Sequence, residues 1–224
     1  MLTLALETST PLGSVAIGDG TRLLAECALS VRATHSETVL DEIERLLARA
    51  GVRPSDLEAV VVGSGPGSFT GVRIAAALAK GLCYARDLPL YAFSSLRALA
   101  ASVGRSRICA VFDARRGEVY AAAYAEGGAG PPTLAPAALP VERLLEGLAP
   151  VEGWAFAGEG ALIHAAILER AGGVVLAPHL GVPRAAALLW LARVAPDGLV
   201  EDRMRWEPSY VRPSGAERGI GRRG

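Results

Sequence analysis

The segment Gly63–Gly71 (GSGPGSFTG) is the part of the sequence whose composition most directly suggests binding chemistry. It precedes residues with helical spacing, and the backbone N–H groups at the start of a helix attract anions. Gly65 and Gly67 can adopt positive φ angles, and Ser68 or Thr70 can cap the helix. The same residues equally suit a structural role, in which the loop sets the angle of the helix. The sequence leaves both interpretations open.

Motifs for nucleophilic or metal-dependent catalysis are missing. The three histidines, His35, His164 and His179, are far apart, and neither an HExxH nor a GxSxG motif occurs. The three cysteines form no CxxC pair, and each has apolar neighbours, which favours a buried free thiol. We therefore predict neither a catalytic residue nor a metal site.

Composition restricts the class of protein. The 224 residues are 51% hydrophobic and 21% charged, and 23 basic residues balance 23 acidic ones. This is typical of a folded globular chain, and it disfavours a protein that binds nucleic acid through excess positive charge. The apolar stretches are too short to span a bilayer, and the first residues do not resemble a signal peptide. We predict a soluble, cytoplasmic protein without membrane contact.

Strand and helix patterns alternate along the chain in a way that is typical of α/β proteins. Residues 2–7, 14–17 and 22–29 are predicted to form antiparallel strands, because a turn and the hairpin signal Asp19-Gly20 separate them. Helices and further strands follow. Among them is the apolar run 58–63, which is typical of a strand buried on both faces.

A reduced version of the same pattern occurs in the second half of the chain, so we predict two lobes of related topology. The N-terminal lobe comprises residues 1–103, and the smaller C-terminal lobe comprises residues 104–207. Residues 126–140, rich in Gly, Pro and Ala, are predicted to be a low-complexity connector. Residues 208–224 are predicted to form a flexible tail.

The helix predicted over residues 72–85 has small or apolar residues on nearly every side. Ile74, Leu78 and Leu82 are predicted to face the sheet. The outer side then carries small residues that let another helix approach closely: Val72, Ala76, Ala79 and Cys83. An exposed apolar surface of this kind indicates a docking site for another polypeptide. The alternative is that the helix is buried inside its own lobe.

Further residues of the predicted interface come from a charged strip on the same helix and from the preceding helix. They are Arg73, Lys80, His35, Leu40, Glu44 and Leu47. Two such helices from each subunit would pack as a four-helix interface. Without its partner, the same surface is predicted to form a homodimer.

Three segments, in this order and spacing, resemble the bacterial TsaB (YeaZ) family. They are residues 6–16 (LETSTPLGSVA), 32–40 (RATHSETVL) and 65–73 (GPGSFTGVR), with further matches at 93–96, 113–120 and 208–212. The resemblance covers the whole chain, and its GPGSFTG segment is highly specific. It implies the α/β, two-lobed actin-like ATPase fold of actin, sugar kinases and Hsp70, with a reduced second lobe.

The function implied by this resemblance is indirect. TsaB-like proteins pair with the catalytic subunit TsaD, which attaches threonylcarbamoyl to the adenosine beside the anticodon in tRNAs that read codons beginning with A. The implied role is that of a non-catalytic partner of a TsaD-like subunit, in contact with a TsaE-like ATPase through the complex and with tRNA only indirectly. The segment that aligns with the metal-binding histidines of TsaD, Ser94–Ala98, contains no histidine. The alternatives are an ATP-dependent small-molecule kinase of the same fold and a peptidase.

Nucleotide binding stays open at this point. In kinases of the implied fold, hairpins hold phosphates through backbone N–H groups, and an acidic residue on the first strand positions Mg²⁺. The residues of this chain that could do so are Glu7, Thr8, Ser9, Gly13, Gly65, Gly67 and Asp113. The turn Asp113–Gly117 would be the second phosphate hairpin, and Gly158–Gly160 would stand at the position of the adenosine loop. The alternative is that they form ordinary turns of a degenerate lobe. ATP or ADP is the cofactor for which the sequence offers candidates.

Overall fold

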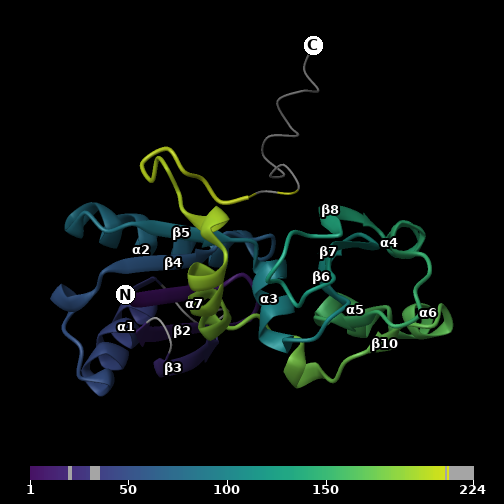
Figure 1. Ribbon diagram of the computed structural model, residues 1–224, viewed down its shortest axis with the longest axis horizontal. Coiled ribbons are helices and arrows are strands. Elements are labelled where there is room, and N and C mark those ends of the chain that lie inside the picture. The colour runs from purple at the N-terminus through teal and green to yellow at the C-terminus, as the bar shows by residue number, and fades with distance from the viewer. Residues whose placement is uncertain (20–21, 31–35, 210, 212–224) are drawn as a thin grey trace, which may run out of the picture.

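The computed structural model describes residues 1–19, 22–30, 36–209 and 211, and these form two α/β lobes that lie side by side (Figure 1). Each lobe is built around a five-stranded sheet. Helix α3 (Ser95–Val103) lies between the lobes, since Leu96 and Leu99 pack on the second sheet and Ala98 packs with residues of the first.

The first sheet has the strand order β3-β2-β1-β4-β5, with β1, β2 and β3 antiparallel and β4 and β5 parallel to β1. Its strands are β1 (Leu2–Glu7), β2 (Leu12–Asp19), β3 (Leu23–Ser30), β4 (Ala59–Gly63) and β5 (Leu90–Phe93). Side chains alternate across the sheet, so Leu4 and Leu6 face one side and Ala5 faces the other. Strand β4 is apolar throughout because helices cover both faces.

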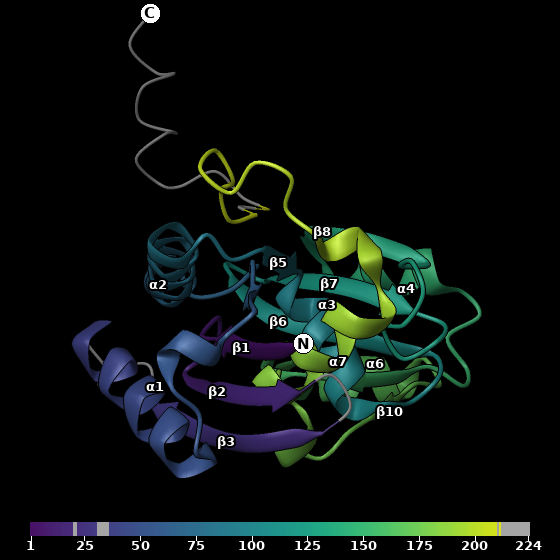
Figure 2. The ribbon, with the colours of Figure 1, turned by 60° about the vertical axis from the view of Figure 1, so that its left-hand side comes forward.

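Helices α1 (Ser36–Ala50) and α2 (Phe69–Arg86) cover one face of this sheet, and α3 and α7 (Ala185–Val194) cover the other (Figure 2). Val39 and Ile43 of α1 join the core on the first face. Leu188 and Leu191 of α7 pack on the second, where the strands offer small residues such as Ala5. These small side chains let α7 lie close to the sheet.

The second sheet repeats the connectivity of the first, with the strand order β10-β9-β6-β7-β8. Its strands are β6 (Ile108–Arg115), β7 (Glu118–Tyr124), β8 (Leu134–Pro140), β9 (Ala155–Ala157) and β10 (Val174–Val175). The helices of this lobe are α4 (Val141–Leu148), α5 (Glu159–Ile163) and α6 (Ala165–Arg170). Short 3₁₀ turns are η2 (Pro54–Asp56), η3 (Pro178–Leu180) and η4 (Pro196–Gly198). The related topology and the reduction of the second lobe agree with the pattern in the sequence.

The prediction of a connector over residues 126–140 is wrong for its second half. Residues 134–140 form β8, which pairs with β7 at the edge of the second sheet. An edge strand needs ladder hydrogen bonds on one side only, so it tolerates prolines such as Pro136 and Pro140. Prolines at these positions concealed the strand in the sequence.

The assignment of residues 104–207 to the second lobe also needs correction, because the chain returns to the first lobe at α7. Beyond α7, Val200 N donates to Leu90 O at 2.9 Å, and Lys80 Nζ donates to the carbonyl oxygen of Trp206 at 3.0 Å. Ser209 N donates to Ser64 O at 2.9 Å, so the first residues of the predicted tail are held in place. Residues 210 and 212–224 of that tail lie outside the described residues.

Arg97 of α3 joins three segments at the junction of the lobes. Its Nε donates to Gly128 O at 2.8 Å, its Nη2 donates to Ala129 O at 3.0 Å, and its Nη1 pairs with Asp197 at 2.7 Å. The guanidinium also lies over the ring of Phe93, at 5.4 Å from its centroid. Because Arg97 is buried, these partners replace the water that the charge would otherwise bind.

We expect Arg97→Met to lower the free energy of unfolding by about 2–4 kcal/mol, because two carbonyl groups and a carboxylate lose their charged partner. Urea unfolding followed by circular dichroism measures this change. Arg143→Met is the control, since Arg143 forms an exposed i,i+3 pair with Glu146 and should change stability by less than about 0.5 kcal/mol. Equal losses in the two variants would contradict a structural role for Arg97.

Candidate functional site

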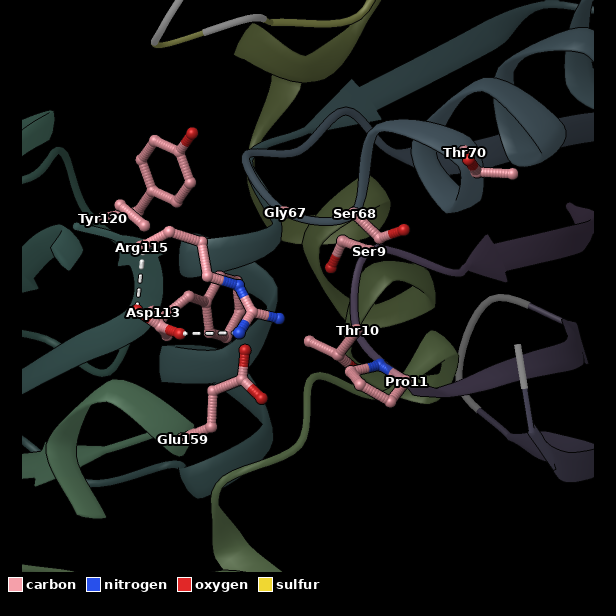
Figure 3. A pocket seen from close by; sticks show the side chains of 12 residues that line it. Ser9, Thr10, Pro11, Gly67, Ser68, Thr70, Asp113, Arg115, Tyr120 and Glu159 are labelled. Atoms are coloured by element: carbon pink, nitrogen blue, oxygen red, sulfur yellow. Dashed lines mark hydrogen bonds and ion pairs between the residues drawn. The ribbon is translucent and has the colours of Figure 1, made fainter. Parts of the chain in front are cut away.

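A cleft of about 440 Å³ lies between the two lobes (Figure 3). The first lobe contributes the turn after β1, residues 9–11, and the end of the glycine-rich loop with the start of α2. The second lobe contributes the β6–β7 hairpin, Tyr120 of β7 and Glu159 at the start of α5. The cleft therefore combines segments that are about a hundred residues apart in the sequence.

The first-lobe wall is a tight junction between the turn after β1 and the start of α2. Ser68 N donates to Ser9 O at 2.7 Å, and Thr8 Oγ1 donates to Gly71 O at 2.7 Å. Gly67 has a φ of 154°, and a Cβ at this position would overlap the carbonyl oxygen of Ser9. Ser68 caps α2, because its Oγ accepts from Gly71 N at 3.3 Å. A glycine is thus required for the wall to close.

The second-lobe wall carries charges of both signs. Asp113 Oδ1 accepts from Arg115 N at 2.8 Å, and Asp113 Oδ2 lies 3.4 Å from Arg115 Nη1. Figure 3 shows the Arg115 guanidinium beside Asp113 and directed into the cleft, with the carboxylate of Glu159 close by. Two carboxylates outnumber the one guanidinium, so a phosphate-bearing ligand here would need an accompanying cation.

Glu7 does not line the cleft but is fully buried behind its first-lobe wall. Its Oε1 accepts from Ser9 N at 2.8 Å, and its Oε2 occupies space that a Cβ on Gly63 would need. Burial raises the pKa of this carboxyl above its ordinary value, although hydrogen bonding at Ser9 opposes the shift. The Glu7 carboxyl is therefore not exposed to the cleft, where its predicted role would have placed it.

The structure brings only part of the predicted nucleotide set to the cleft: Ser9, Gly67 and Asp113. The others lie behind its walls and serve the fold: Glu7, Thr8, Gly13 and Gly65. Gly65 N, for example, donates to Ser95 Oγ at 3.2 Å. Residues outside these seven candidates that also line the cleft are Thr10, Pro11, Ser68, Thr70, Phe112, Ala114, Arg115, Tyr120 and Glu159. Ala114 and Arg115 belong to the predicted second phosphate hairpin and Glu159 to the predicted adenosine loop, whereas Phe112 and Tyr120 were missed.

The prediction for the outer side of α2 is wrong. Four residues expected on that side are buried against the first lobe's own core: Val72, Ala76, Ala79 and Cys83. Ile74, Leu78 and Leu82, expected against the sheet, do pack against the core of the first lobe but are only partly buried. The physical reason is that small side chains let α2 lie close to the valine-rich strand β4. The predicted docking surface therefore cannot consist of these small residues.

The other predicted interface residues differ in burial and in the contacts that they make. Leu47 is buried in the core of the first lobe, which corrects its assignment to the surface, whereas Leu40 and Glu44 are exposed on α1. Lys80 is engaged within the chain, because its Nζ donates to Met204 O and Trp206 O, both at 3.0 Å. His35 lies outside the described residues.

The exposed face of α2 consists of Arg73, Ala77, Gly81 and Tyr84, which we call the α2 strip. Their spacing of three or four residues places them along one side of the helix. The Arg73 guanidinium lies 4.8 Å from the centroid of the Phe69 ring, and Tyr84 is 74% exposed. Outside the backbone of its own helix, a Cβ on Gly81 would have no atom of the described residues within 4 Å. The middle of the α2 strip therefore has small residues only, and large side chains lie at its two ends.

Comparison with known proteins connects this architecture to a family. The model of the family described as "TsaD: tRNA N6-adenosine threonylcarbamoyltransferase" matches residues 26–208. The solved structure of YeaZ from Pseudomonas aeruginosa superposes with a TM-score of 0.80 and 34% identity, over 93% of this chain and 99% of that chain. The chain belongs to the TsaB (YeaZ) family. A second structure, described as similar to peptidase YEAZ from the same organism, has a TM-score of 0.81 and 34% identity over 94% of this chain and 99% of that chain.

TsaB relatives of known name agree with this assignment. The tRNA threonylcarbamoyladenosine biosynthesis protein TsaB of Bacillus subtilis is 40% identical over 127 residues, and that of Escherichia coli is 38% identical over 128 residues. Each match covers 55% of this chain and 55% of the relative, so the chain spans about half the length of the curated relatives that it matches. The predicted α/β fold of two lobes with a reduced second lobe is confirmed.

Within the described ranges, no group of three or more His, Cys, Asp or Glu side chains is arranged to hold a metal ion. No helix in the same part of the chain is long and apolar enough to cross a bilayer. His164 lies between α5 and α6 and His179 lies in η3, and neither lines the cleft.

We expect Glu7→Gln to remove a pH dependence of stability from this chain. The stabilisation from protonated Glu7 is complete below its ordinary pKa of 4.5 and is lost as the pH rises through its raised folded pKa. Relative to the variant, the wild type should therefore become less stable with increasing pH, by at most about 1.4 kcal/mol per pH unit. Urea unfolding from pH 4 upward measures the difference. Glu159→Gln, at an exposed position, is the control, and the same slope in both variants would contradict the assignment.

Proposed function

We propose that this chain is a non-catalytic subunit that pairs with a TsaD-like catalytic subunit and so supports the formation of threonylcarbamoyladenosine in tRNA. Membership of the TsaB family and the names of its relatives support the pathway. The observation that supports the pairing is the α2 strip. Its central glycine, Gly81, is not needed for packing among the described residues. In this proposal the chain positions or activates the catalytic subunit and transfers no group itself.

The start of α3 supports the non-catalytic role. The resemblance implies that a TsaD-like subunit holds its metal with two histidines one helical turn apart in this segment. Here Ser94 caps the helix through Leu96 N at 3.3 Å, and Ser95 Oγ accepts from Gly65 N. Arg97 is bound to backbone carbonyls and Asp197. These side chains are committed to the fold and are not metal ligands.

Gly81 supports the pairing surface because the isolated chain does not benefit from it. A glycine inside a helix lowers stability by roughly 1 kcal/mol relative to alanine. Packing among the described residues does not require the glycine, since none of their atoms outside its own helix backbone lies within 4 Å of the missing Cβ. A second polypeptide that approaches the α2 backbone closely would use this space. With Ala77 one turn earlier, Gly81 forms a shallow seat for a helix of the partner.

Large exposed side chains border this seat and supply contact area. Phe69 and Tyr84 lie at the two ends of α2, and Leu40 is exposed on α1, which covers the same face of the first sheet (Figure 2). Aromatic residues contribute strongly to interface affinity when a partner covers them. The proposed interface therefore uses both helices, as the sequence indicated, but through a different side of α2.

We expect Gly81→Ala to have opposite effects on the lone chain and on the complex. The lone chain should gain about 1 kcal/mol in stability, and its affinity for a TsaD-like subunit should fall, because the new methyl group separates the helices. Urea unfolding and isothermal titration calorimetry measure the two effects.

The matched control for this variant is Gly147→Ala on α4 of the second lobe, also an exposed helix glycine. This change should leave pairing unaltered. An affinity of the Gly81 variant equal to that of the Gly147 variant would remove the basis of the proposed seat.

Ala77→Glu should weaken pairing by at least about tenfold, because a charged side chain would be buried in the seat without a partner. The fold should be unaffected, since Ala77 is exposed in the lone chain. Threonylcarbamoyl transfer to tRNA, assayed with the catalytic subunit and threonylcarbamoyl-AMP, should fall in parallel with binding. Ala166→Glu on α6 is the control, and transfer by this chain without the catalytic subunit would refute the proposed division of roles.

A further inference from the structure

Helix α7 has an exposed apolar side on the face of the first sheet opposite α2. Its inner side packs on the sheet through Leu188 and Leu191. Its outer side carries Trp190, Arg193 and Val194, all exposed. A tryptophan and a valine on the outside of a helix that is otherwise nearly all apolar are unusual for a surface that faces water alone.

A hollow of about 370 Å³ runs beside this helix, and we call it the α7 groove. Its walls are formed by Leu189 and Trp190 of α7, by Met1, and by Leu23 at the start of β3. Met1 is 49% exposed, Leu23 is 50% exposed and Trp190 is 36% exposed. The groove is therefore an open apolar channel and not a gap within the core.

The same tryptophan also lines a separate hollow. This second hollow of about 490 Å³ is lined by Trp190 and by residues at the junction of the lobes, including Gly104 and Gly127. Trp190 thus forms a ridge between two hollows. An elongated surface of this kind suits a segment of polypeptide better than a compact small molecule, which an enclosed pocket would hold.

The charges along the α7 groove are positive. Arg22 and Arg193 line it, and no described residue of its lining carries a carboxylate, whereas Glu126 lines the second hollow. Arg22 pairs with Asp19 at 2.9 Å, but Arg193 forms no ion pair with any residue that the structure describes. A carboxylate on an incoming segment could therefore pair with Arg193 without displacing an existing partner.

We propose that the α7 groove binds a short segment of a partner polypeptide that carries apolar side chains next to carboxylates. The apolar side chains cover Trp190, Leu23 and Met1, and a carboxylate pairs with Arg193. The groove and the α2 strip lie on opposite faces of the first sheet (Figure 2), so both can be occupied at once. This surface does not depend on the pairing proposed above.

The test uses two fluorescein-labelled pentapeptides with the same leucines and phenylalanine, one with two glutamates and the other with two lysines. The full chain should bind the glutamate peptide saturably in fluorescence anisotropy, and binding should weaken with added salt. Arg193→Glu and Trp190→Ala should each lower the affinity by about tenfold. Arg170→Glu, at an exposed arginine of the second lobe, and Tyr84→Ala, on the α2 strip, should leave it unchanged.

Three results would overturn the proposal. The first is the absence of saturable binding of the glutamate peptide, and the second is equal affinity for the lysine peptide or equal effects of Arg193→Glu and Arg170→Glu. The third is self-association of the chain that Trp190→Ala abolishes, which would assign the groove to a second copy. Tyr84→Ala separates this proposal from the proposed pairing, since it should weaken binding to a TsaD-like subunit while the peptide still binds.

Discussion

The close contact between the turn after β1 and the start of α2 is the constraint on which the site depends. Gly67 lets the loop pass directly against the carbonyl of Ser9, and two hydrogen bonds, Ser68 N to Ser9 O and Thr8 Oγ1 to Gly71 O, hold the contact. The same contact forms one wall of the cleft and sets the direction of α2. The cleft and the α2 strip therefore share one support, although they face different surroundings.

Small residues on α2 serve two different purposes, and only their surroundings distinguish them. Ala75 and Ala79 are small because the helix lies directly on the valines of β4. Gly81 and Ala77 lie on the opposite, exposed side, where packing among the described residues does not require small side chains. The first group raises the packing density of the lobe, and the second leaves room for another molecule. A helix with two such faces can be stable alone and still present a close-approach surface.

The two lobes are joined by more than the chain that passes between their sheets. Arg97 binds the Gly128 and Ala129 carbonyls in the second lobe and Asp197 in the returning segment. Helix α7 packs on the first sheet, and the residues after it reach the glycine-rich loop through Ser209. The final segment of the chain thus holds the face of the first sheet opposite α2 and the loop that precedes α2. This arrangement keeps the cleft walls in a defined position.

The sequence by itself determined the α/β class, the opening hairpins, the reduced repeat and the glycine-rich loop before a helix. These features follow from local periodicity, turn residues and glycine positions, which act over a few residues. It also placed Ser9, Gly67 and Asp113 among the candidates that the cleft brings together. It misplaced the exposed side of α2, because small side chains suit both a close sheet and a close partner. It also missed β8, whose prolines are tolerated only because the strand lies at an edge.

Only the tertiary structure decided which charged and polar groups are exposed and can bind another molecule. Glu7 lies next to the cleft in sequence yet is sealed behind it, and Lys80 is bound by carbonyls more than a hundred residues away. The exposed side of α7 and its groove likewise depend on β1 and β3, at the other end of the chain. Burial and hydrogen bonding between distant segments are set by packing of the whole chain, and local sequence patterns carry no information about them.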